Sequence, residues 1–232
     1  VQATYGCLNR CEFCVTPYCS KGYYHRPVED VIEEIKQIPS KTFVFVDPSP
    51  IEDDYAKELY KAMIPLKKQW ASPMTIKIAQ DKELLNLAVK SGLKGCLIGF
   101  ETVSQETLLD IKKGFNSVNK FYNAANILHD NGVAIMGCFV FGLDCDDKGC
   151  FERTIEFVNK ANIDVPRFTI NTAYPGTPYY EKMKAANRII ETDWSLYDCQ
   201  HVVIKPLKMT VDELREGHNW AWNEAYKTRK EK

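Results

Sequence analysis

Three closely spaced cysteines are the residues of this chain with the clearest chemical meaning. Cys7, Cys11 and Cys14 form a CxxxCxxC run, and Phe13 stands just before the third cysteine. Thiolates bind soft metals and iron–sulfur clusters, and a cubane cluster held by protein alone takes four cysteines. A run of three leaves one iron without a protein ligand, and an open coordination position is where a substrate can bind. The spacing therefore predicts an iron–sulfur centre with one free position.

Two other interpretations of the cysteines stand beside this one. With Cys19 as a fourth ligand the segment would form a structural zinc site, although four-cysteine zinc sites usually use two separated CxxC pairs. A cluster with four protein ligands would instead indicate electron transfer or redox sensing. A disulfide framework is not favoured, because the nine cysteines are an odd number and 45% hydrophobic residues can build a core without cross-links. Cys96 and Cys138 lie in apolar runs and are expected to be buried.

The run Tyr5-Gly-Cys-Leu-Asn-Arg-Cys-Glu-Phe-Cys14 resembles the signature of the radical S-adenosylmethionine (radical SAM) superfamily. In that family Cys7, Cys11 and Cys14 would hold a [4Fe–4S] cluster, and S-adenosylmethionine (SAM) would bind the fourth iron. An electron from the cluster would cleave SAM to a 5′-deoxyadenosyl radical, which takes a hydrogen atom from an unactivated carbon. The resemblance thus implies an enzyme with a small-molecule substrate and an electron donor such as flavodoxin or ferredoxin.

Strand and helix patterns alternate along the chain, which predicts an α/β fold of parallel strands with helical crossovers. We expect strands at residues 1–5, 42–46, 74–79, 96–100, 133–141 and 167–172. We expect helices near residues 26–35, 53–66, 82–91, 104–112, 118–131 and 148–161. Six βα units match the partial TIM-type (β/α)6 barrel that the resemblance implies. This barrel is predicted to cover residues 1–190, and residues 191–232 a C-terminal helical extension packed on it.

Polar residues at the carboxyl ends of the predicted strands are the next site candidates, because barrel enzymes place their chemistry there. Glu101 directly follows an apolar strand, where its carboxylate can accept hydrogen bonds from a ribose diol or an ammonium group. Residues 98–102 also resemble the fourth-strand motif of the family; the alternative is that Glu101 caps the next helix. Asp47 and Gln80 follow the second and third predicted strands. Asp47 could replace the family's GGE run, which holds the methionine amino group, or could simply form a turn.

The remaining cofactor-binding candidates follow from the resemblance and from residue type. Lys113 and Asn116 resemble the element that meets the SAM carboxylate, with surface solvation as the alternative. Gly137, in the fifth strand, would let an adenine ring approach the backbone, or would serve barrel packing alone. Phe13 and Tyr174 are expected to neighbour the adenine or the substrate, although aromatic residues are commonly core residues.

Several segments narrow the resemblance to cobalamin-binding radical SAM proteins. These include the helix at residues 82–91, the PGTP run at 175–178 and the segment 201–209; the tail is similar to hopanoid methylases and anaerobic Mg-protoporphyrin cyclases. The resemblance implies an upstream cobalamin domain missing from this chain and methyl transfer from methylcobalamin to the substrate radical. No cobalamin-ligating DxHxxG motif occurs in the sequence. Radical oxidation, cyclisation or rearrangement without cobalamin is the alternative, and a methylthiotransferase is a weaker variant of it.

Charge and hydropathy argue against a nucleic-acid partner and against a membrane span. The formal net charge is −1, so no basic footprint for nucleic acid is expected. No apolar run reaches the roughly 18 residues that a membrane span needs. An iron–sulfur site with an open iron is sensitive to oxygen, so we expect a reducing cytoplasm.

Overall fold

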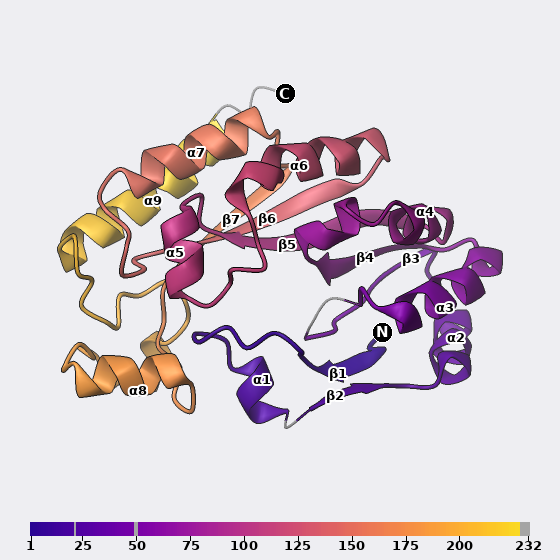
Figure 1. Ribbon diagram of the computed structural model, residues 1–232, viewed down its shortest axis with the longest axis horizontal. Coiled ribbons are helices and arrows are strands. Elements are labelled where there is room, and N and C mark those ends of the chain that lie inside the picture. The colour runs from indigo at the N-terminus through magenta and orange to yellow at the C-terminus, as the bar shows by residue number, and fades with distance from the viewer. Residues whose placement is uncertain (21, 49–50, 228–232) are drawn as a thin grey trace.

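A curved parallel sheet forms the frame of the protein, as the sequence predicts. The computed structural model describes residues 1–20, 22–48 and 51–227. Within these residues five strands are hydrogen-bonded in chain order, each parallel to the next. They are β3 (Thr42–Val44), β4 (Gln69–Met74), β5 (Leu93–Glu101), β6 (Ala134–Phe141) and β7 (Val165–Ile170). Sequential parallel neighbours joined by helices produce the α/β half-barrel seen in Figure 1.

The connecting helices lie close to where their sequence patterns predict them. They are α2 (Val28–Gln37), α3 (Asp54–Met63), α4 (Lys82–Lys90), α5 (Gln105–Asp110), α6 (Phe121–Asp130) and α7 (Cys150–Lys160). Short 3₁₀ turns are η1 (Ile64–Leu66), η2 (Ile76–Ala79), η3 (Val118–Lys120) and η4 (Trp194–Leu196). The side chains of Asp53, Asp81 and Ser104 accept hydrogen bonds from backbone N–H groups of the first turns of α3, α4 and α5. These residues fix the starts of three helices, because the first turn has no intrahelical acceptors.

Alternation along the central strands sorts their side chains onto two faces. On β5, Phe100 is fully buried and its ring lies 4.9 Å from that of Phe121 on α6 and 5.3 Å from that of Phe157 on α7. The aromatic core therefore lies between the sheet and its helices, and each such ring pair adds about 0.5–1.5 kcal/mol beyond burial. Leu97 and Glu101 alternate with these residues and point to the opposite, concave face.

The C-terminal part of the chain packs on the far edge of the sheet. Helix α9 (Val211–Lys227) lies against α7 and β7 (Figure 1). The Trp222 ring meets Phe168 edge-on at 5.5 Å, and the Tyr226 hydroxyl donates to the Pro166 carbonyl oxygen at 2.7 Å. Helix α8 (Pro178–Ala185) instead belongs to a second, smaller core. The helical extension is thus present, while its boundary at residue 190 stays a prediction and residues 228–232 lie outside the described part.

The first strand differs from the prediction. Strand β1 (Thr4–Gly6) pairs antiparallel with β2 (Tyr23–His25) instead of joining the parallel sheet, so five parallel strands replace the six expected in the described residues. Gly6 explains the change of direction, because its φ is +91° and a Cβ there would lie 1.8 Å from the Gly22 carbonyl oxygen. Val1 still lies beside β3: its ammonium group donates to the Val44 carbonyl oxygen at 3.1 Å, and its carbonyl oxygen accepts from the Val46 N–H at 2.9 Å.

The third strand lies five residues earlier than predicted. Strand β4 ends at Met74, and the predicted strand at residues 74–79 is mostly the 3₁₀ turn η2. Ile76 and Ile78 are both fully buried, so their alternation suits a packed turn as well as a strand. The actual strand contains Pro73 and starts with Gln69, which weaken its strand pattern. The helix that begins next, α4, stands where it is expected.

Asp47 ties the N-terminal segment to the end of β3. Its carboxylate is 3% exposed and accepts hydrogen bonds from the Ala3 N–H at 3.0 Å and from the Thr4 hydroxyl at 2.6 Å, with the Thr4 N–H as a further donor. Burial is the main influence on this carboxyl and raises its pKa. The oxygens of Asp47 thus hold the segment that enters the cysteine run, and a cofactor-binding role for Asp47 stays a prediction.

No helix in the described residues is both long enough and apolar enough to cross a membrane.

Replacing Asp47 by alanine is expected to lower the free energy of unfolding by about 2–4 kcal/mol, because two buried N–H groups and a hydroxyl lose their acceptor. Denaturant titration of the chain measures this change. Asp130→Ala is the matched control, because Asp130 is exposed at the end of α6 and its loss should change stability by less than about 0.5 kcal/mol. Equal midpoints for the two variants would show that the Asp47 contacts do not stabilise the fold.

Asp146 should make stability depend on pH. Its carboxylate is 4% exposed and accepts from the Gly142 and Leu143 N–H groups, and burial raises its pKa to about 7. The folded state then binds the proton more tightly than the unfolded state, so stability falls as pH rises from about 4 to about 7. Asp146→Asn keeps an oxygen acceptor without the charge and should remove on the order of 1–3 kcal/mol of this fall. Denaturation midpoints at pH 5 and pH 8 test it; parallel pH curves for both proteins would contradict the assignment.

Candidate active site

The three cysteines of the run line one cavity, which we call the thiol cavity. It has a volume of about 190 Å³ and lies between the cysteine loop, residues 7–20, and the concave face of the sheet. Among the described residues no disulfide joins Cys7, Cys11 or Cys14 to another cysteine, and Cys11 is 7% exposed. The other residues that line the cavity are Asn9, Phe13, Pro73, Met74, Thr75, Leu97, Gly99, Glu101, Lys113 and Phe115. The loop thus directs its thiols to the strand ends, as the sequence predicts.

The thiols influence one another electrostatically. Burial raises the pKa of Cys11 to about 11; the Lys113 ammonium opposes this, whereas Cys14, Glu101 and Cys7 add to it. Thiolates that share a cavity need a compensating positive charge. Among the described residues, no three His, Cys, Asp or Glu side chains form a group that could hold a metal ion. The thiols share a cavity wall without forming such a group.

Cys19, the fourth ligand of the zinc interpretation, lies elsewhere. It ends the short helix α1 (Thr16–Cys19), is exposed, and does not line the thiol cavity.

Glu101 and Lys113 face the thiols from the end of β5. Their side chains form an ion pair and are only 11% and 10% exposed, and the Lys113 ammonium also donates to the Gly99 carbonyl oxygen at 2.8 Å. Glu101 has a φ of +64°, a conformation that costs a non-glycine residue about 1–3 kcal/mol and is found mainly at functional sites. It does not cap the next helix, because the Ser104 hydroxyl accepts from the Thr107 N–H there.

Gly99 makes room for this pair. A Cβ at this position would lie 2.3 Å from a Glu101 carboxylate oxygen and 2.8 Å from the Lys113 nitrogen. Residues two apart on a strand share a face, so the spacing of Gly99 and Glu101 is the signal in the sequence. The sequence analysis used this glycine only within a motif and did not select it as a site residue.

Asn116 lies beside the pair and carries an unused acceptor. It is 1% exposed, and its side-chain amide donates to the Gly99 carbonyl oxygen at 3.1 Å. Its own side-chain oxygen is buried without a hydrogen-bond partner. A buried polar atom without a partner is costly, so this oxygen could accept a hydrogen bond from a bound group. Lys113 and Asn116 are therefore buried rather than solvated on the surface.

A polar side cavity of about 130 Å³ adjoins the thiol cavity and shares Cys7, Asn9 and Thr75 with it. Glu52 lines it and accepts hydrogen bonds from the Thr75 N–H and, at 2.6 Å, the Thr75 hydroxyl; burial raises the pKa of Glu52 to about 7. Sequence reasoning missed both residues. Thr75 directly follows β4, so a correct strand end would have selected it by the same rule that selected Glu101.

Aromatic side chains close the thiol cavity. Phe13 lines it as predicted, and Phe115 lines it from the segment after α5. The nitrogen atoms of Lys77 and Lys113 lie 5.2 and 5.8 Å from the centre of the Phe115 ring. Sequence reasoning did not select Phe115, although it lies between two residues that were selected.

Five predicted cofactor-binding residues do not line the thiol cavity: Asp47 and Asn116, described above, and Gln80, Gly137 and Tyr174. Gln80 is exposed six residues beyond β4 and accepts from the Lys120 ammonium at 3.2 Å. Gly137 faces the helical side, where a Cβ would lie 2.9 Å from Ile163 and 3.3 Å from Phe100. The Tyr174 hydroxyl lies 2.9 Å from the Cys199 sulfur, beside the second core. The strand-end and strand-glycine arguments for Gln80 and Gly137 therefore do not hold in this structure.

Comparison with curated proteins finds methyltransferases and a cyclase. The chain is 32% identical over 235 residues to the bacteriochlorophyllide d C-12(1)-methyltransferase of Chlorobaculum tepidum, covering 98% of this chain and 51% of that protein. It is 25% identical over 219 residues to the anaerobic magnesium-protoporphyrin IX monomethyl ester cyclase of Rubrivivax gelatinosus, covering 90% and 39%. The chain thus spans about half the length of the first of these relatives and less of the second.

Comparison with solved structures shows the same fold at low identity. The radical SAM methyltransferase TsrM from Kitasatospora setae, solved with cobalamin and a [4Fe–4S] cluster, matches with a TM-score of 0.74 and 16% identity over 93% of this chain and 45% of that one. The cobalamin-dependent SAM radical enzyme OxsB, solved with aqua-cobalamin and SAM, matches with a TM-score of 0.68 and 13% identity over 97% and 41%.

The family assignment comes from the sequence itself. Residues 1–158, more than half of the chain, match the Radical SAM superfamily, and this segment contains the cysteine run, Glu101 and Lys113. Together with the half-barrel and the thiol cavity, this match shows that the chain belongs to the radical SAM superfamily.

Proposed function

We propose that this chain is the catalytic core of an enzyme that methylates an unactivated carbon of a small molecule, with cobalamin as the methyl carrier. The observation that carries the proposal is that the three cysteines of the run and a buried Glu101–Lys113 pair line one cavity. The bacteriochlorophyllide methyltransferase relative supports methyl transfer. The cyclase relative favours a second candidate, radical oxidation or cyclisation without cobalamin.

Cys7, Cys11 and Cys14 would hold a [4Fe–4S] cluster, because they are soft sulfur ligands that line the same cavity. When bound and reduced, the cluster supplies the electron that cleaves SAM to the 5′-deoxyadenosyl radical. An electron donor such as flavodoxin or ferredoxin and a reducing cytoplasm belong to the same proposal.

The remaining residues of the cavity bind and orient SAM in this proposal. SAM brings both an ammonium and a carboxylate group, so Lys113 can exchange Glu101 for the incoming carboxylate while Glu101 takes an ammonium or a ribose hydroxyl. Asn116 does not line the cavity, and its side-chain amide supports the Gly99 carbonyl oxygen beside the pair. Phe13 and Phe115 provide apolar walls for the adenine and exclude water from the reactive carbon.

Cobalamin binding is proposed for a domain upstream of this chain. Its support is the fold shared with TsrM and OxsB, which were both solved with cobalamin. The described residues supply the SAM site of the proposal only.

Cys11→Ala should abolish both the cluster and SAM cleavage, whereas Cys19→Ala should keep both, because only Cys11 lines the thiol cavity. The chain is reconstituted anaerobically with iron and sulfide, reduced, and examined by electron paramagnetic resonance with and without SAM. The release of 5′-deoxyadenosine is assayed in parallel. Cys19→Ala is the matched control, since it removes a thiol from the same loop.

A cluster signal that SAM does not perturb, without 5′-deoxyadenosine, would contradict the radical mechanism. Zinc binding that requires Cys19 would support the other interpretation, in which the cysteine run forms a structural zinc site. Addition of methylcobalamin to the longer protein then separates the two radical candidates, since only the first consumes its methyl group.

Gly99→Ala should weaken SAM binding by roughly tenfold or more, which corresponds to about 1.4 kcal/mol or more. The added methyl group overlaps both members of the Glu101–Lys113 pair and forces them to move. Gly95→Ala is the control on the same strand, because its Cβ would meet Ala71 at an ordinary 3.5 Å. Equilibrium binding of SAM to the reconstituted proteins measures both; equal affinities would show that the pair does not position SAM.

A further inference from the structure

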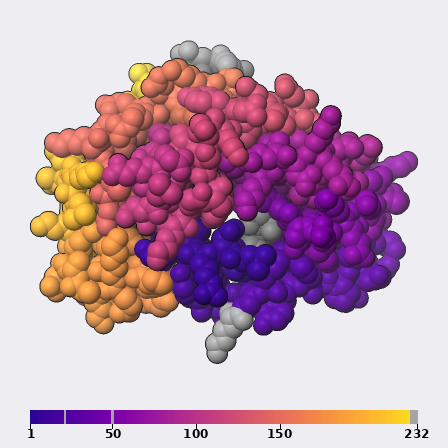
Figure 2. Space-filling view, viewed as in Figure 1, coloured from indigo at the N-terminus to yellow at the C-terminus, as the bar shows by residue number. Residues whose placement is uncertain are grey.

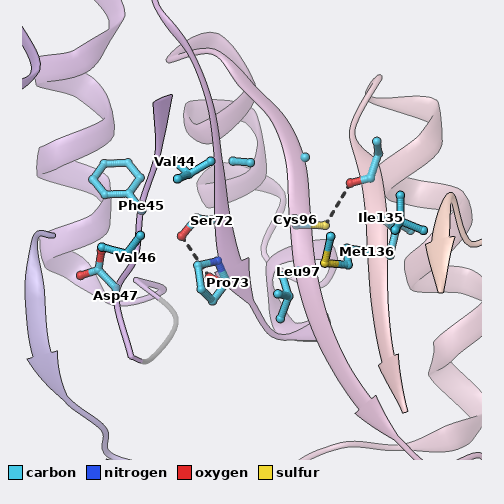
Figure 3. Close-up of a pocket in the computed structure, with 14 residues that line it drawn as sticks. Val44, Phe45, Val46, Asp47, Ser72, Pro73, Cys96, Leu97, Ile135 and Met136 are labelled. Carbon is cyan, nitrogen blue, oxygen red and sulfur yellow. Dashed lines mark hydrogen bonds between the residues drawn. The ribbon is translucent and has the colours of Figure 1, made fainter. Parts of the chain in front are cut away.

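A second cavity lies on the same concave face, and its lining is almost entirely apolar. It has a volume of about 460 Å³ and extends across all five strands from β3 to β7. We call it the apolar trench; its principal side chains are Val44, Val46, Pro73, Leu97, Met136 and Val165. Figure 3 shows Leu97 between Pro73 and Met136, with Val44 and Val46 farther along the same row of strands.

The trench exposes apolar surface at both of its edges. Val44 and Val46 are 55% and 62% exposed beside β3, and Val165 at the start of β7 is 42% exposed. Scattered exposed apolar residues are ordinary, whereas a continuous apolar lining of this size indicates a binding site. Figure 2 shows the molecule hollowed between the indigo N-terminal segment and the magenta elements.

The few polar groups of the trench already have partners. The Asp47 carboxylate holds Ala3 and Thr4, the Ser72 hydroxyl donates to the Pro73 carbonyl oxygen at 3.1 Å, and the Cys96 thiol donates to the Ala134 carbonyl oxygen at 3.6 Å. A charged or strongly polar ligand group would lose its hydration here without compensation. The body that fits the trench is therefore uncharged and apolar.

The trench and the thiol cavity are continuous. Pro73 and Leu97 line both of them. Neighbouring strands are about 4.8 Å apart, so a floor of five strands measures roughly 19 Å along the curved sheet. A single aromatic ring would leave most of this floor uncovered, whereas a broad flat body would cover it and bring one edge to the thiol cavity.

We propose that the apolar trench binds the substrate, and that the substrate is a tetrapyrrole macrocycle whose reacting edge carbon is presented to the thiol cavity at Pro73 and Leu97. This inference rests on the proposed function and specifies its substrate class. The relatives named above act on a bacteriochlorophyllide and on magnesium-protoporphyrin, which are both tetrapyrroles. Because the trench offers no polar partner, the carboxylates of the macrocycle lie outside it.

The test measures binding of protoporphyrin IX to the chain by absorbance and fluorescence titration. Met136→Glu places a charge on the floor of the trench, and Val46→Asp places one at its exposed rim, where the fold should tolerate it. Each should weaken binding by roughly tenfold or more, because the macrocycle would have to desolvate the new charge. Leu109→Asp is the matched control, since Leu109 on α5 is also 62% exposed but does not line the trench.

Equal porphyrin affinity in the wild type and the three variants would overturn the proposal. Displacement of the porphyrin by palmitate at equal concentration would also overturn it, because an acyl chain would then be the preferred occupant. Loss of a wild-type dimer in Val46→Asp, seen by size-exclusion chromatography without any porphyrin binding, would assign the trench to a second copy of the chain instead. SAM cleavage is assayed separately. If the chain cleaves SAM but does not bind porphyrin, only the trench proposal is contradicted. If porphyrin binding depends on the trench but SAM is not cleaved, only the proposed function is contradicted.

Discussion

The cysteine loop has little regular structure, so its position depends on the contacts that fix it against the sheet. Asp47 holds Ala3 and Thr4 at its entry, and the β1–β2 pairing closes the chain behind it. Midway, the Glu12 carboxylate pairs with Lys112, and the Glu12 carbonyl oxygen accepts from the Tyr179 N–H at 3.3 Å. The loop is therefore anchored to three elements that are far apart in the sequence, and three thiols can face one cavity without a helix or strand beneath them.

The opposite wall of the thiol cavity is rigid, because it belongs to the central strand of the sheet. Glu101 and Lys113 form a buried ion pair there, and the desolvation of two such charges offsets much of their attraction. Together with the left-handed backbone at Glu101, this is a local cost that the aromatic core behind β5 must compensate. A pair of opposite charges held in a cavity suits a zwitterionic ligand, since each charge can be exchanged for its counterpart in the ligand without leaving a buried charge alone.

The sequence predicted an element correctly where a local pattern of neighbouring residues determines its structure. The apolar strand before Glu101 and the starts of the helices near residues 82 and 104 each depend on neighbouring residues, and each is found as expected. The prediction failed where the structure of a segment depends on contacts with residues that are far away in the sequence. Ile76 and Ile78 alternate like a strand but pack as a turn, which moved the strand end and selected Gln80 in place of Thr75. Asp47 and Gly137 have suitable residue types, yet only the tertiary structure shows that one faces the N-terminal segment and the other the helices.

The concave face is divided along the strands, and the division has a physical reason. Toward the carboxyl ends lie the charged and thiol groups, which need donors, acceptors and a positive centre; the neighbouring trench is lined mainly by apolar side chains. A radical that attacks an unactivated carbon will react with whatever hydrogen-bearing group is nearest, so selectivity must come from position rather than from acid–base chemistry. Leu97 and Gly99 are adjacent positions on this face of β5, one in the apolar part and one under the ion pair. In the proposed reaction, this one strand would fix the distance between a substrate held by apolar contact and a cofactor held by charge.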